Sequence, residues 1–435
     1  MKIIQSVVAS AIALTTITTS VMGDDLQKSL SDGKMTADLR AFYFNGDRDN
    51  RTDREAFVVG GIVKYESASY YGFKVGGAFF GAYDLLDAGM QTAQKGSIEN
   101  GAPVNLVTKN LAGNTEMVNS DGSAIETLGE AYLQYNVGQT MLKVGRQRLN
   151  TPLMNDYYNR FLPNSFEAVL LTNKDIPDTE LMAIYSFGWK YKASDTFIGM
   201  TDGLEDPAID EDVMMLGFKN STIPNTKVGV YVYHMPNVID TFYTQVDNSK
   251  LVEIDAFKLS FSLQYLNQQE SGDALRGPLD SYLAGAKVNF ALGNAKFTAM
   301  YDQVGDHTIE GSGTDYSAMG FSKFINFTDI QIDGEALNAG AVSYGAVFGY
   351  KFGDFKPAIK YVHIEQDLAM EAAGTTSNTR PSSDEWNLDF KYKIDDVSKL
   401  RVRLAEIDYE STHPNEFDEV NIRVIYDYKF SVSGS

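Results

Sequence analysis

Two arginines late in the chain have the residue type and the spacing of an anion-binding pair. Arg401 and Arg403 lie two residues apart, which places both side chains on one face of a strand, about 6.6 Å apart along it. Each guanidinium group can offer two parallel N–H donors to a carboxylate. Such a pair would bind a carboxylate and let it pass from one arginine to the next. The residues that alternate with them are apolar: Leu400, Val402 and Leu404.

The other residue types exclude most covalent and metal chemistry. The chain has no cysteine, which excludes disulfides, thiolate zinc sites, iron–sulfur clusters and cysteine nucleophiles. The histidines are far apart in the sequence, and no G-x-S-x-G motif surrounds a serine. We therefore expect no enzyme activity, no metal site and no cofactor. The four histidines are His234, His307, His363 and His413.

Charge and composition limit the class of partner. The 435 residues include 37 Lys+Arg and 58 Asp+Glu, which gives a net charge of −21. A nucleic-acid binder needs clustered basic residues to neutralise phosphates, so we expect no nucleic-acid partner. The chain is 43% hydrophobic, which is too apolar for a disordered protein.

Residues 1–23 are typical of an export signal. Lys2 supplies the positive charge, residues 3–14 are mostly apolar, and small residues precede a cleavage site before Asp24. This apolar stretch is short for the ~20 residues that a membrane-spanning helix needs. The longest later stretch without a charge, residues 336–350, is also too short for such a helix.

Alternation of apolar and polar residues with a period of two predicts β-strands along nearly the whole chain. In the last segment, Arg423, Asp427 and Lys429 share a polar face opposite Val424 and Tyr426. A soluble β-sandwich would alternate in the same way, so this pattern leaves the architecture open. Eighteen strands are predicted, at 36–44, 55–66, 70–83, 126–137, 140–149, 165–173, 179–190, 212–220, 226–235, 240–248, 254–267, 280–291, 295–304, 339–352, 356–366, 384–394, 399–409 and 418–430.

The connections between these strands favour a membrane barrel. Every second connection is tight, such as residues 292–294, whereas those in between include the long segments 84–125 and 305–338. Short turns on one rim and long loops on the other are typical of outer-membrane barrels. A spanning sheet must also close, because every backbone N–H and C=O group in hydrocarbon needs a partner. We therefore predict an all-β, antiparallel transmembrane barrel of about 18 strands.

The connection after the fifth predicted strand contains several family-like motifs. Pro152 and Pro163 enclose a polar and aromatic stretch whose composition is too structured for a solvated tether. The region resembles the OprD-type family of substrate-specific outer-membrane porins of Gram-negative bacteria. The matching motifs are G-R-Q-x-L at 145–149, T-P at 151–152 and R-x-L-P-N-x-F-E at 160–167, with further similarity at 39–45 and across the last three strands.

The resemblance implies a function and a set of site residues. It implies an outer-membrane porin for passive diffusion of small hydrophilic solutes, in which a basic ladder on one wall guides carboxylates past an inward-folded constriction loop. Closure of the barrel would make the first and last strands neighbours, so that the ladder forms one stripe. The implied ladder is Arg40, Arg401, Arg403 and Arg423, extended by Lys391 and Lys393, and the implied constriction residues are Asn155, Asp156, Tyr157 and Arg160.

Other interpretations remain open at this point. The basic residues can simply pair with lumenal acids such as Asp38, Asp389 and Asp427 and keep the wall hydrated. A general or sugar-type porin without carboxylate selectivity is the alternative within transport, and a sugar-type pore needs more lumenal aromatics than Phe42 and Phe44. A structural or adhesive surface barrel is the alternative outside transport, and its filled lumen would conduct no current.

The resulting organisation is a signal peptide at 1–23, a short periplasmic segment at 24–35, a barrel at 36–430 and a C-terminal tail at 431–435. The expected location is the outer membrane of a Gram-negative bacterium. The expected partners are small hydrophilic solutes, membrane lipid and lipopolysaccharide. A homotrimer is compatible with the sequence, because its contacts would use outer faces as apolar as those that face lipid.

The first prediction concerns residues 149–164, which we expect inside the barrel at its narrowest point. Deletion of residues 154–159 should raise single-channel conductance in planar bilayers, because less of the lumen is then blocked. Unchanged conductance from a correctly folded, trypsin-resistant barrel would contradict the prediction.

Overall fold

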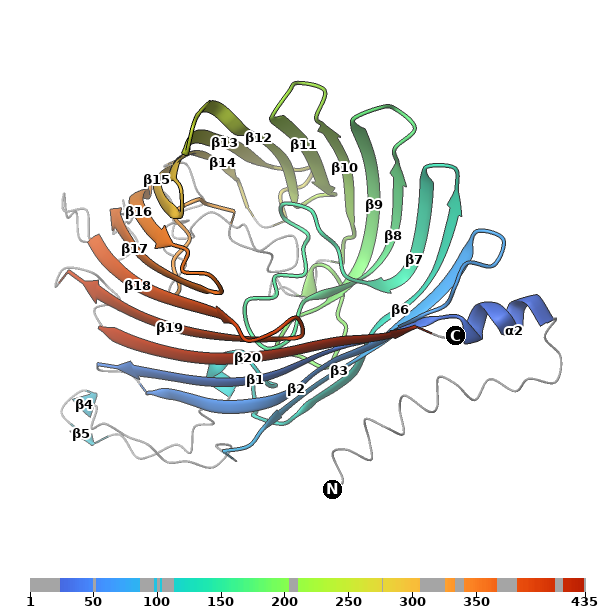
Figure 1. Cartoon of the computed structure of the whole chain (residues 1–435), viewed down its shortest axis with the longest axis horizontal. Coiled ribbons are helices and arrows are strands. Elements are labelled where there is room, and N and C mark those ends of the chain that lie inside the picture. The colour runs from blue at the N-terminus through green and yellow to red at the C-terminus, as the bar shows by residue number, and fades with distance from the viewer. Residues whose placement is uncertain are drawn as a thin grey trace.

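The chain forms one closed antiparallel barrel of 18 strands (Figure 1). The computed structural model describes residues 24–49, 52–86, 98–99, 102–103, 113–202, 210–275, 277–305, 325–332, 340–365, 382–410 and 418–433. The predicted signal peptide at 1–23 lies outside these residues. The predicted architecture and strand number are confirmed.

The barrel strands follow one another around the wall in chain order. A short helix, α2 (Asp24–Ser31), precedes them, and the connection after β3 contains the small strands β4 (Ile98–Glu99) and β5 (Ala102–Pro103) and the 3-10 turn η2 (Gly113–Thr115). The barrel strands are β1 (Lys34–Arg48), β2 (Arg54–Glu66), β3 (Phe73–Asp84), β6 (Ile125–Val137), β7 (Thr140–Gln147), β8 (Ser165–Asn173), β9 (Thr179–Lys190), β10 (Val213–Asn220), β11 (Thr226–Met235), β12 (Ile239–Ile254), β13 (Phe257–Glu270), β14 (Asp280–Leu292), β15 (Ala295–Val304), β16 (Val342–Tyr350), β17 (Phe355–Glu365), β18 (Ser382–Lys393), β19 (Ser398–Tyr409) and β20 (Glu419–Ser433).

The pairing of β1 with β20 closes the barrel. It runs from Lys34 opposite Ser433 to Arg48 opposite Glu419, so neither the first nor the last strand has a free edge. This pairing also corrects two predicted boundaries. The barrel begins at Lys34 rather than at residue 36, and the early start of β1 provides partners for residues 431–433 of the expected tail.

The longest hairpin, β12–β13, also differs from the prediction. The two strands were expected at 240–248 and 254–267, with a turn between them. They instead continue to a two-residue turn at Asp255 and Ala256, with a bulge between Asn248 and Val252. The bulge absorbs the extra residues of β12, so that pairing resumes beyond it.

The two faces of each strand differ as the alternation predicts. On β18, Trp386 faces outward and is 50% exposed, whereas Glu385 and Asn387 face the interior and are 1% and 6% exposed. On β19, Val402 lies on the outward face and Ile407 on the inward face, where it is fully buried. An apolar outward face is favourable in contact with lipid.

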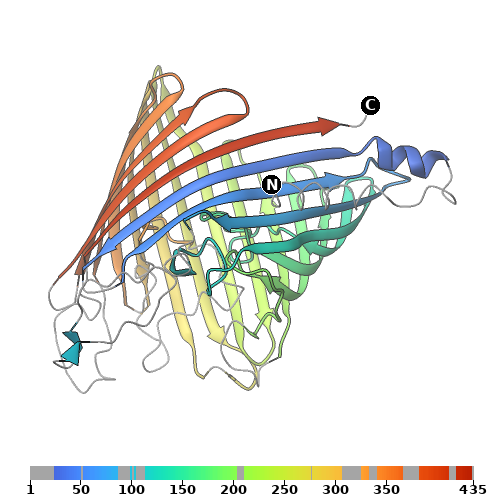
Figure 2. The ribbon, with the colours of Figure 1, turned by 90° about the horizontal axis from the view of Figure 1, so that it is seen from below.

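Short connections and the ends of the described chain gather at one rim. The turns between β6 and β7, β8 and β9, and β14 and β15 are all short. The helix α2 and the end of β20 lie at this rim, and β4–β5 lie at the opposite one (Figure 2). The opposite rim carries the long connections, such as the one between β15 and β16. Among the described residues, no helix is long and apolar enough to cross a membrane.

Several of the long connections turn back into the lumen and pack on the inner wall. In the connection between β7 and β8, Leu153 and Met154 join a buried apolar cluster with wall residues such as Tyr233. Further along the same connection, Phe161 packs in a second cluster with Phe42 and Phe44 of β1. The inward-folded loop predicted from the sequence is therefore present (Figure 1).

Gly60 and Gly61 lie where neighbouring strands leave no space for a side chain. Their φ angles are 146° and 140°, in a region that favours glycine. A Cβ atom on Gly61 would lie 2.1 Å from the carbonyl oxygen of Asp38, and one on Gly60 would lie 2.2 Å from that of Gly81. The glycines therefore permit the close approach of β1, β2 and β3.

This close approach yields a stability prediction. Gly61→Ala should destabilise the barrel by roughly 1–3 kcal/mol, through backbone strain and the contact with Asp38. The measurement is the temperature at which the compact, heat-modifiable gel band converts to the unfolded one. Gly349→Ala is the matched control, because a Cβ atom there meets nothing closer than 3.7 Å. Equal conversion temperatures for the two variants would contradict the prediction.

Candidate functional site

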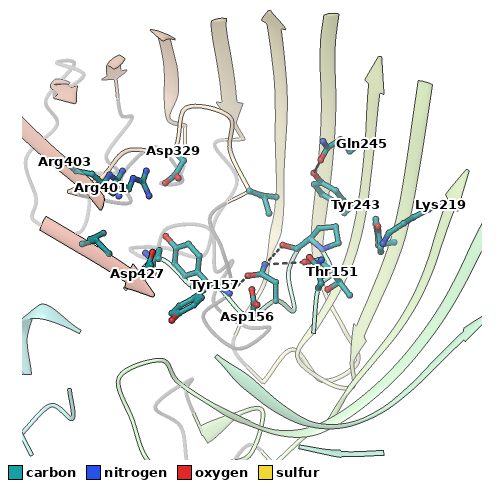
Figure 3. Close-up of a pocket in the computed structure, with 18 of the residues that line it drawn as sticks. Thr151, Asp156, Tyr157, Lys219, Tyr243, Gln245, Asp329, Arg401, Arg403 and Asp427 are labelled. Atoms are coloured by element: carbon teal, nitrogen blue, oxygen red, sulfur yellow. Dashed lines mark hydrogen bonds between the residues drawn. The ribbon is translucent and has the colours of Figure 1, made fainter. Parts of the chain in front are cut away.

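A cavity of about 690 Å³, here called the central cavity, lies between the inward loops and the barrel wall. One side is formed by residues 150–159 of the connection between β7 and β8. Figure 3 shows Arg401, Arg403 and Asp427 of the wall on one side of it, and Lys219, Tyr243 and Gln245 on the other. The full lining is Arg40, Asn150, Thr151, Pro152, Asn155, Asp156, Tyr157, Tyr158, Asn159, Lys219, Tyr231, Tyr243, Gln245, Ile325, Asp329, Arg401, Arg403, Ile425 and Asp427.

A tight turn anchors the constriction loop, residues 149–164, to the wall. The Thr151 hydroxyl donates to the Met154 carbonyl oxygen at 2.8 Å and accepts from the Met154 N–H at 3.0 Å. The Tyr233 hydroxyl of β11 accepts from the Leu153 N–H at 3.2 Å and donates to the Thr151 hydroxyl at 3.1 Å. Because Leu153, Met154 and Tyr233 are fully buried, these bonds hold the turn against β11.

Three of the predicted constriction residues shape the loop in different ways. The Asn155 side chain donates to the Pro152 carbonyl oxygen at 3.0 Å and accepts from the Tyr157 N–H at 2.9 Å. The Asp156 carboxylate accepts from Arg148 Nε at 2.9 Å. Asn155, Asp156 and Tyr157 all line the central cavity, so the structure brings these three predicted residues together there.

Arg160, the fourth predicted constriction residue, turns away from the central cavity into an ionic cluster. Its Nε lies 3.2 Å from Glu116, and Lys192 Nζ lies 2.9 Å from the same carboxylate. Lys192 also donates to the Asn159 side chain at 3.1 Å. The cluster thereby ties the constriction loop to two other connections, one between β3 and β6 and one between β9 and β10.

Electrostatics keep the acid of this cluster ionised. Partial burial opposes ionisation of Glu116, but the neighbouring Lys192 and Arg160 outweigh it and hold the pKa of this carboxyl well below its usual range. Burial lowers the pKa of Lys192 to about 8, although Glu116 favours its charged form. At neutral pH the cluster therefore holds a carboxylate between two cations.

Arg40 connects the wall to the constriction loop. Its Nε donates to Asp427 at 2.6 Å, and its Nη1 donates to the Arg160 carbonyl oxygen at 2.6 Å. The guanidinium carbon lies 4.3 Å from the centre of the Tyr158 ring. With these contacts, Arg40 positions the loop in addition to lining the cavity.

Arg401 and the two predicted lysines have acidic partners. Arg401 donates to both oxygens of Asp389, at 2.8 Å and 2.7 Å, and Lys391 lies 3.1 Å from the same carboxylate. Lys393 pairs with Asp396 at 2.5 Å. Lys391 and Lys393 do not line the central cavity. Their contacts fit the alternative interpretation, in which the basic residues pair with acids and keep the wall hydrated.

Arg403 and Arg423 lie opposite each other on β19 and β20 and have no acidic partner among the described residues. Arg423 is 2% exposed, and it donates to the Asn421 side chain and to the Gln331 carbonyl oxygen, both at 2.8 Å. Arg403 lines the central cavity. Its Nε is buried without a hydrogen-bond partner.

A second inward segment, residues 325–332, lies over Arg423 and is here called the strap. Asp302 of β15 accepts the Thr328 N–H at 2.7 Å and the Thr328 hydroxyl at 2.8 Å. Glu385 of β18 accepts the Gln331 N–H at 2.6 Å and the Ile332 N–H at 2.9 Å. Two buried wall carboxylates therefore satisfy backbone donors of the strap.

Sequence reasoning missed the strap and its cavity residue, Asp329. The connection that contains it was recognised only as a long loop. Ile330 and Ile332 alternate with Gln331, and both pack against wall residues that include Val362 and Ile407. This apolar alternation inside a polar loop is the signal that could have located the strap.

A second cavity, of about 840 Å³, lies on the other side of the constriction loop. Three of its basic residues have acidic partners: Lys64 with Glu130 at 2.8 Å, Lys429 with Asp38 at 2.6 Å, and Arg148 with Asp156. Lys143 instead lies 3.6 Å from the centre of the Tyr132 ring. Apart from Lys429, whose strand face was recognised, sequence reasoning singled out none of these basic residues as a pore contact.

The two aromatic residues considered for a sugar-type pore do not face solutes. Phe42 and Phe44 are fully buried, because the constriction loop and Met117 cover them. Their position weakens the sugar-type alternative.

The ionic cluster generates a prediction with a pH dependence. Glu116→Gln should loosen the constriction loop and raise conductance at pH 7. A carboxylate whose pKa falls on folding contributes stability above its unfolded pKa and loses it only as the pH falls through the folded value. Because the pKa of Glu116 is well below its usual range, the difference from the unmodified protein should persist at pH 5.

Glu126→Gln is the matched control for this experiment. Glu126 accepts a hydrogen bond from the Tyr83 hydroxyl on the outward face of the barrel, away from the constriction loop. Equal conductance of the Glu116→Gln variant and the unmodified protein at pH 7 would contradict the prediction, as would a difference that vanishes at pH 5.

Comparisons with known proteins agree with this geometry. The sequence pattern of the outer membrane porin, OprD family, matches residues 28–432. A search of curated protein sequences found no match. Three similar solved structures are Acinetobacter baumannii OccAB3 (16% identity, TM-score 0.74, covering 92% of this chain and 100% of that one), Pseudomonas aeruginosa OccK9 (OpdG) (17%, 0.73, 93% and 100%) and Pseudomonas aeruginosa OpdK with vanillate (18%, 0.70, 93% and 100%).

The family match runs from within α2 to one residue before the end of β20. Because the solved structures are less than 20% identical in sequence to this chain, they support its fold and nothing further. Together with the closed barrel, the inward loop and the open cavity, the match leads to one conclusion: the chain belongs to the OprD family of outer-membrane porins, and is a channel of the Gram-negative outer membrane.

Proposed function

We propose that this porin favours solutes that carry a carboxylate, and that Arg403 is their main contact. The observation that carries the proposal is the buried, unpartnered Nε of Arg403 beside the central cavity. A buried guanidinium donor without a partner is unfavourable. A passing carboxylate can bind the part of this guanidinium group that lines the cavity and so compensate its buried charge.

The charges around the cavity support the same preference. Its lining contains four basic and three acidic side chains, although the whole chain has a net charge of −21. Arg403 also lies directly opposite Arg423, and like charges in that arrangement repel. A lumen with low-dielectric walls focuses such an excess of positive charge. The lining thus attracts anions in spite of the acidic sequence.

The contacts change the expected path of the solute. The Nε and Nη2 edge of Arg401 is occupied by Asp389, so a carboxylate that moves from Arg403 to Arg401 reaches a guanidinium group whose charge is already paired. Conduction needs contacts strong enough to admit a solute and weak enough to release it. Arg403 serves as the first contact, and the paired Arg401 as a weaker one.

A solved relative offers chemical support. The OpdK structure was determined with vanillate, a molecule that carries a carboxylate. The barrel of that protein superimposes on this one with a TM-score of 0.70 at 18% identity. Its ligand is one member of the solute class that we propose for this chain.

The proposal predicts a change in solute preference. Arg403→Gln should lower gluconate uptake relative to sorbitol, a neutral molecule of similar size, by about tenfold or more, since a charge-assisted hydrogen bond contributes roughly 1.5–3 kcal/mol. Arg403→Lys should restore uptake only in part, because lysine lacks the planar fork. Liposome swelling with the two solutes provides the measurement.

Lys258→Gln provides the control, because it removes the same charge at an exposed position that lines neither cavity. If gluconate and sorbitol uptake fall equally in the Arg403→Gln variant, or if both stay unchanged, the proposed preference for carboxylates is wrong. The protein would then be a general porin.

A further inference from the structure

A third cavity, of about 520 Å³, lies at the rim that carries the short turns and is here called the rim cavity. Ile176 and Asp178 of the turn between β8 and β9 line it, as does Ser221 directly after β10. Pro152 of the constriction loop lines both this cavity and the central one. Because short turns face the periplasm in outer-membrane barrels, the rim cavity leads from the central cavity toward the periplasm.

The second cavity reaches the same rim at a different part of the wall. Its lining includes Asp396 and Val397 of the turn between β18 and β19, and Ser431 near the end of β20. Among the described residues, the rim cavity and the second cavity share no lining residue. A solute that has passed the central cavity therefore has two ways out, one through each of these cavities.

The two ways out differ in the charge at their junction with the central cavity. The residues that line both the central cavity and the rim cavity are Pro152, Lys219, Tyr231, Tyr243 and Gln245. Lys219 is the charged residue of this group. The residues that line both the central cavity and the second cavity are Asn150 and Asp156, and Asp156 pairs with Arg148. An anion thus meets a cation at the first junction and a carboxylate at the second.

Lys219 belongs to β10 and lies across the central cavity from Arg401 and Arg403 (Figure 3). Its Nζ lies 3.7 Å from Glu180, and Lys174 lies 3.4 Å from the same carboxylate. One carboxylate is therefore shared by two lysines. Glu180 lines the rim cavity but not the central cavity. The group thus keeps an excess of positive charge, which Lys219 presents to the central cavity.

The wall beside Lys219 is fixed by its own hydrogen bonds. The Tyr243 hydroxyl donates to the Gln245 side chain at 2.6 Å. The Gln245 side chain donates to the Asp247 carboxylate at 2.8 Å, and the Ser262 hydroxyl donates to the same carboxylate at 2.6 Å. Asp247 lines the rim cavity, and its negative charge is thus directed toward neighbouring donors. The junction offers a solute a rigid polar surface next to one lysine.

We propose that anionic solutes leave the central cavity through the rim cavity, with Lys219 as a second anion contact on the wall opposite the arginines. This inference rests on the proposed function, since it assumes that the solute carries a carboxylate. It goes beyond that function because it assigns the path after Arg403 and the residue that guides the solute along it.

The physical reason is the order in which the solute meets the two cations. A charged residue in a lumen with low-dielectric walls acts over a longer range than it would on an open surface. The Lys219 side chain is 41% exposed, so its attraction for an anion is weaker than that of a buried guanidinium group. A weak contact that follows a strong one draws the solute onward without trapping it.

The first test changes the charge at the junction. Lys219→Gln should lower gluconate uptake in the liposome-swelling assay by roughly two- to fivefold, whereas sorbitol uptake should stay unchanged. Lys219→Arg should retain gluconate uptake, because it keeps the positive charge. Should Lys219→Gln fail to yield a heat-modifiable barrel, Lys219→Met replaces it.

Lys258→Gln is the matched control for this test. Lys258 also pairs with a glutamate, Glu253 at 2.7 Å, but it lines none of the three cavities. Its substitution should leave the uptake of both solutes unchanged.

The second test blocks each way out separately. Because the chain has no cysteine, a single introduced thiol can be labelled selectively. Ser221 and Ser431 are both exposed, and they line the rim cavity and the second cavity respectively. The variants Ser221→Cys and Ser431→Cys are each labelled with a maleimide that carries a bulky neutral polyethylene glycol chain. The label should lower gluconate uptake more in the Ser221→Cys variant than in the Ser431→Cys variant.

The outcomes separate this inference from the proposed function. Equal losses of gluconate uptake in the two labelled variants, or a larger loss in the Ser431→Cys variant, would overturn the path. Unchanged gluconate uptake in Lys219→Gln, or sorbitol uptake that falls by the same factor, would overturn the role of Lys219. If instead Arg403→Gln leaves gluconate preference unchanged, the proposed function is wrong, whereas the labelling still measures the path because it does not depend on Arg403.

Discussion

The structure depends on one constraint: inside a membrane, every backbone hydrogen-bonding group must find a partner within the protein. The sheet meets this constraint by closing β1 on β20. Closure with 18 strands creates a wide lumen. The wall alone would therefore discriminate poorly between solutes, and selectivity must come from segments that fold into the lumen.

The inward segments also need hydrogen-bond partners, because they place backbone N–H groups against the side chains of the barrel wall. Buried acceptors on the wall provide these partners. Asp302 and Glu385 receive N–H groups of the strap, and the Tyr233 hydroxyl receives one from the constriction loop. Buried groups of this kind are favourable only when fully satisfied. The loops therefore behave as fixed parts of the pore lining.

The arginines of the ladder have separate roles for the same reason. Arg40 supports the constriction loop, Arg401 is paired with Asp389, and Arg423 is covered by the strap. Of these four arginines, Arg403 is the one with a buried donor that lacks an acceptor beside the cavity among the described residues. The four arginines thus have three roles: Arg40 and Arg423 support the inward loops, Arg401 is a paired cation, and Arg403 is the proposed contact for an anion.

The sequence by itself determined the barrel, the strand number and the face on which each ladder residue lies, because alternation within a strand is a local property. It also located the constriction loop through Pro152 and Pro163. Only the tertiary structure decided which arginines lack an acidic partner, since Asp389 lies opposite Arg403 in the register of β18 and β19 but forms its ion pair with Arg401. Ion pairing depends on distances between segments far apart in the chain, and neither spacing nor composition encodes those distances.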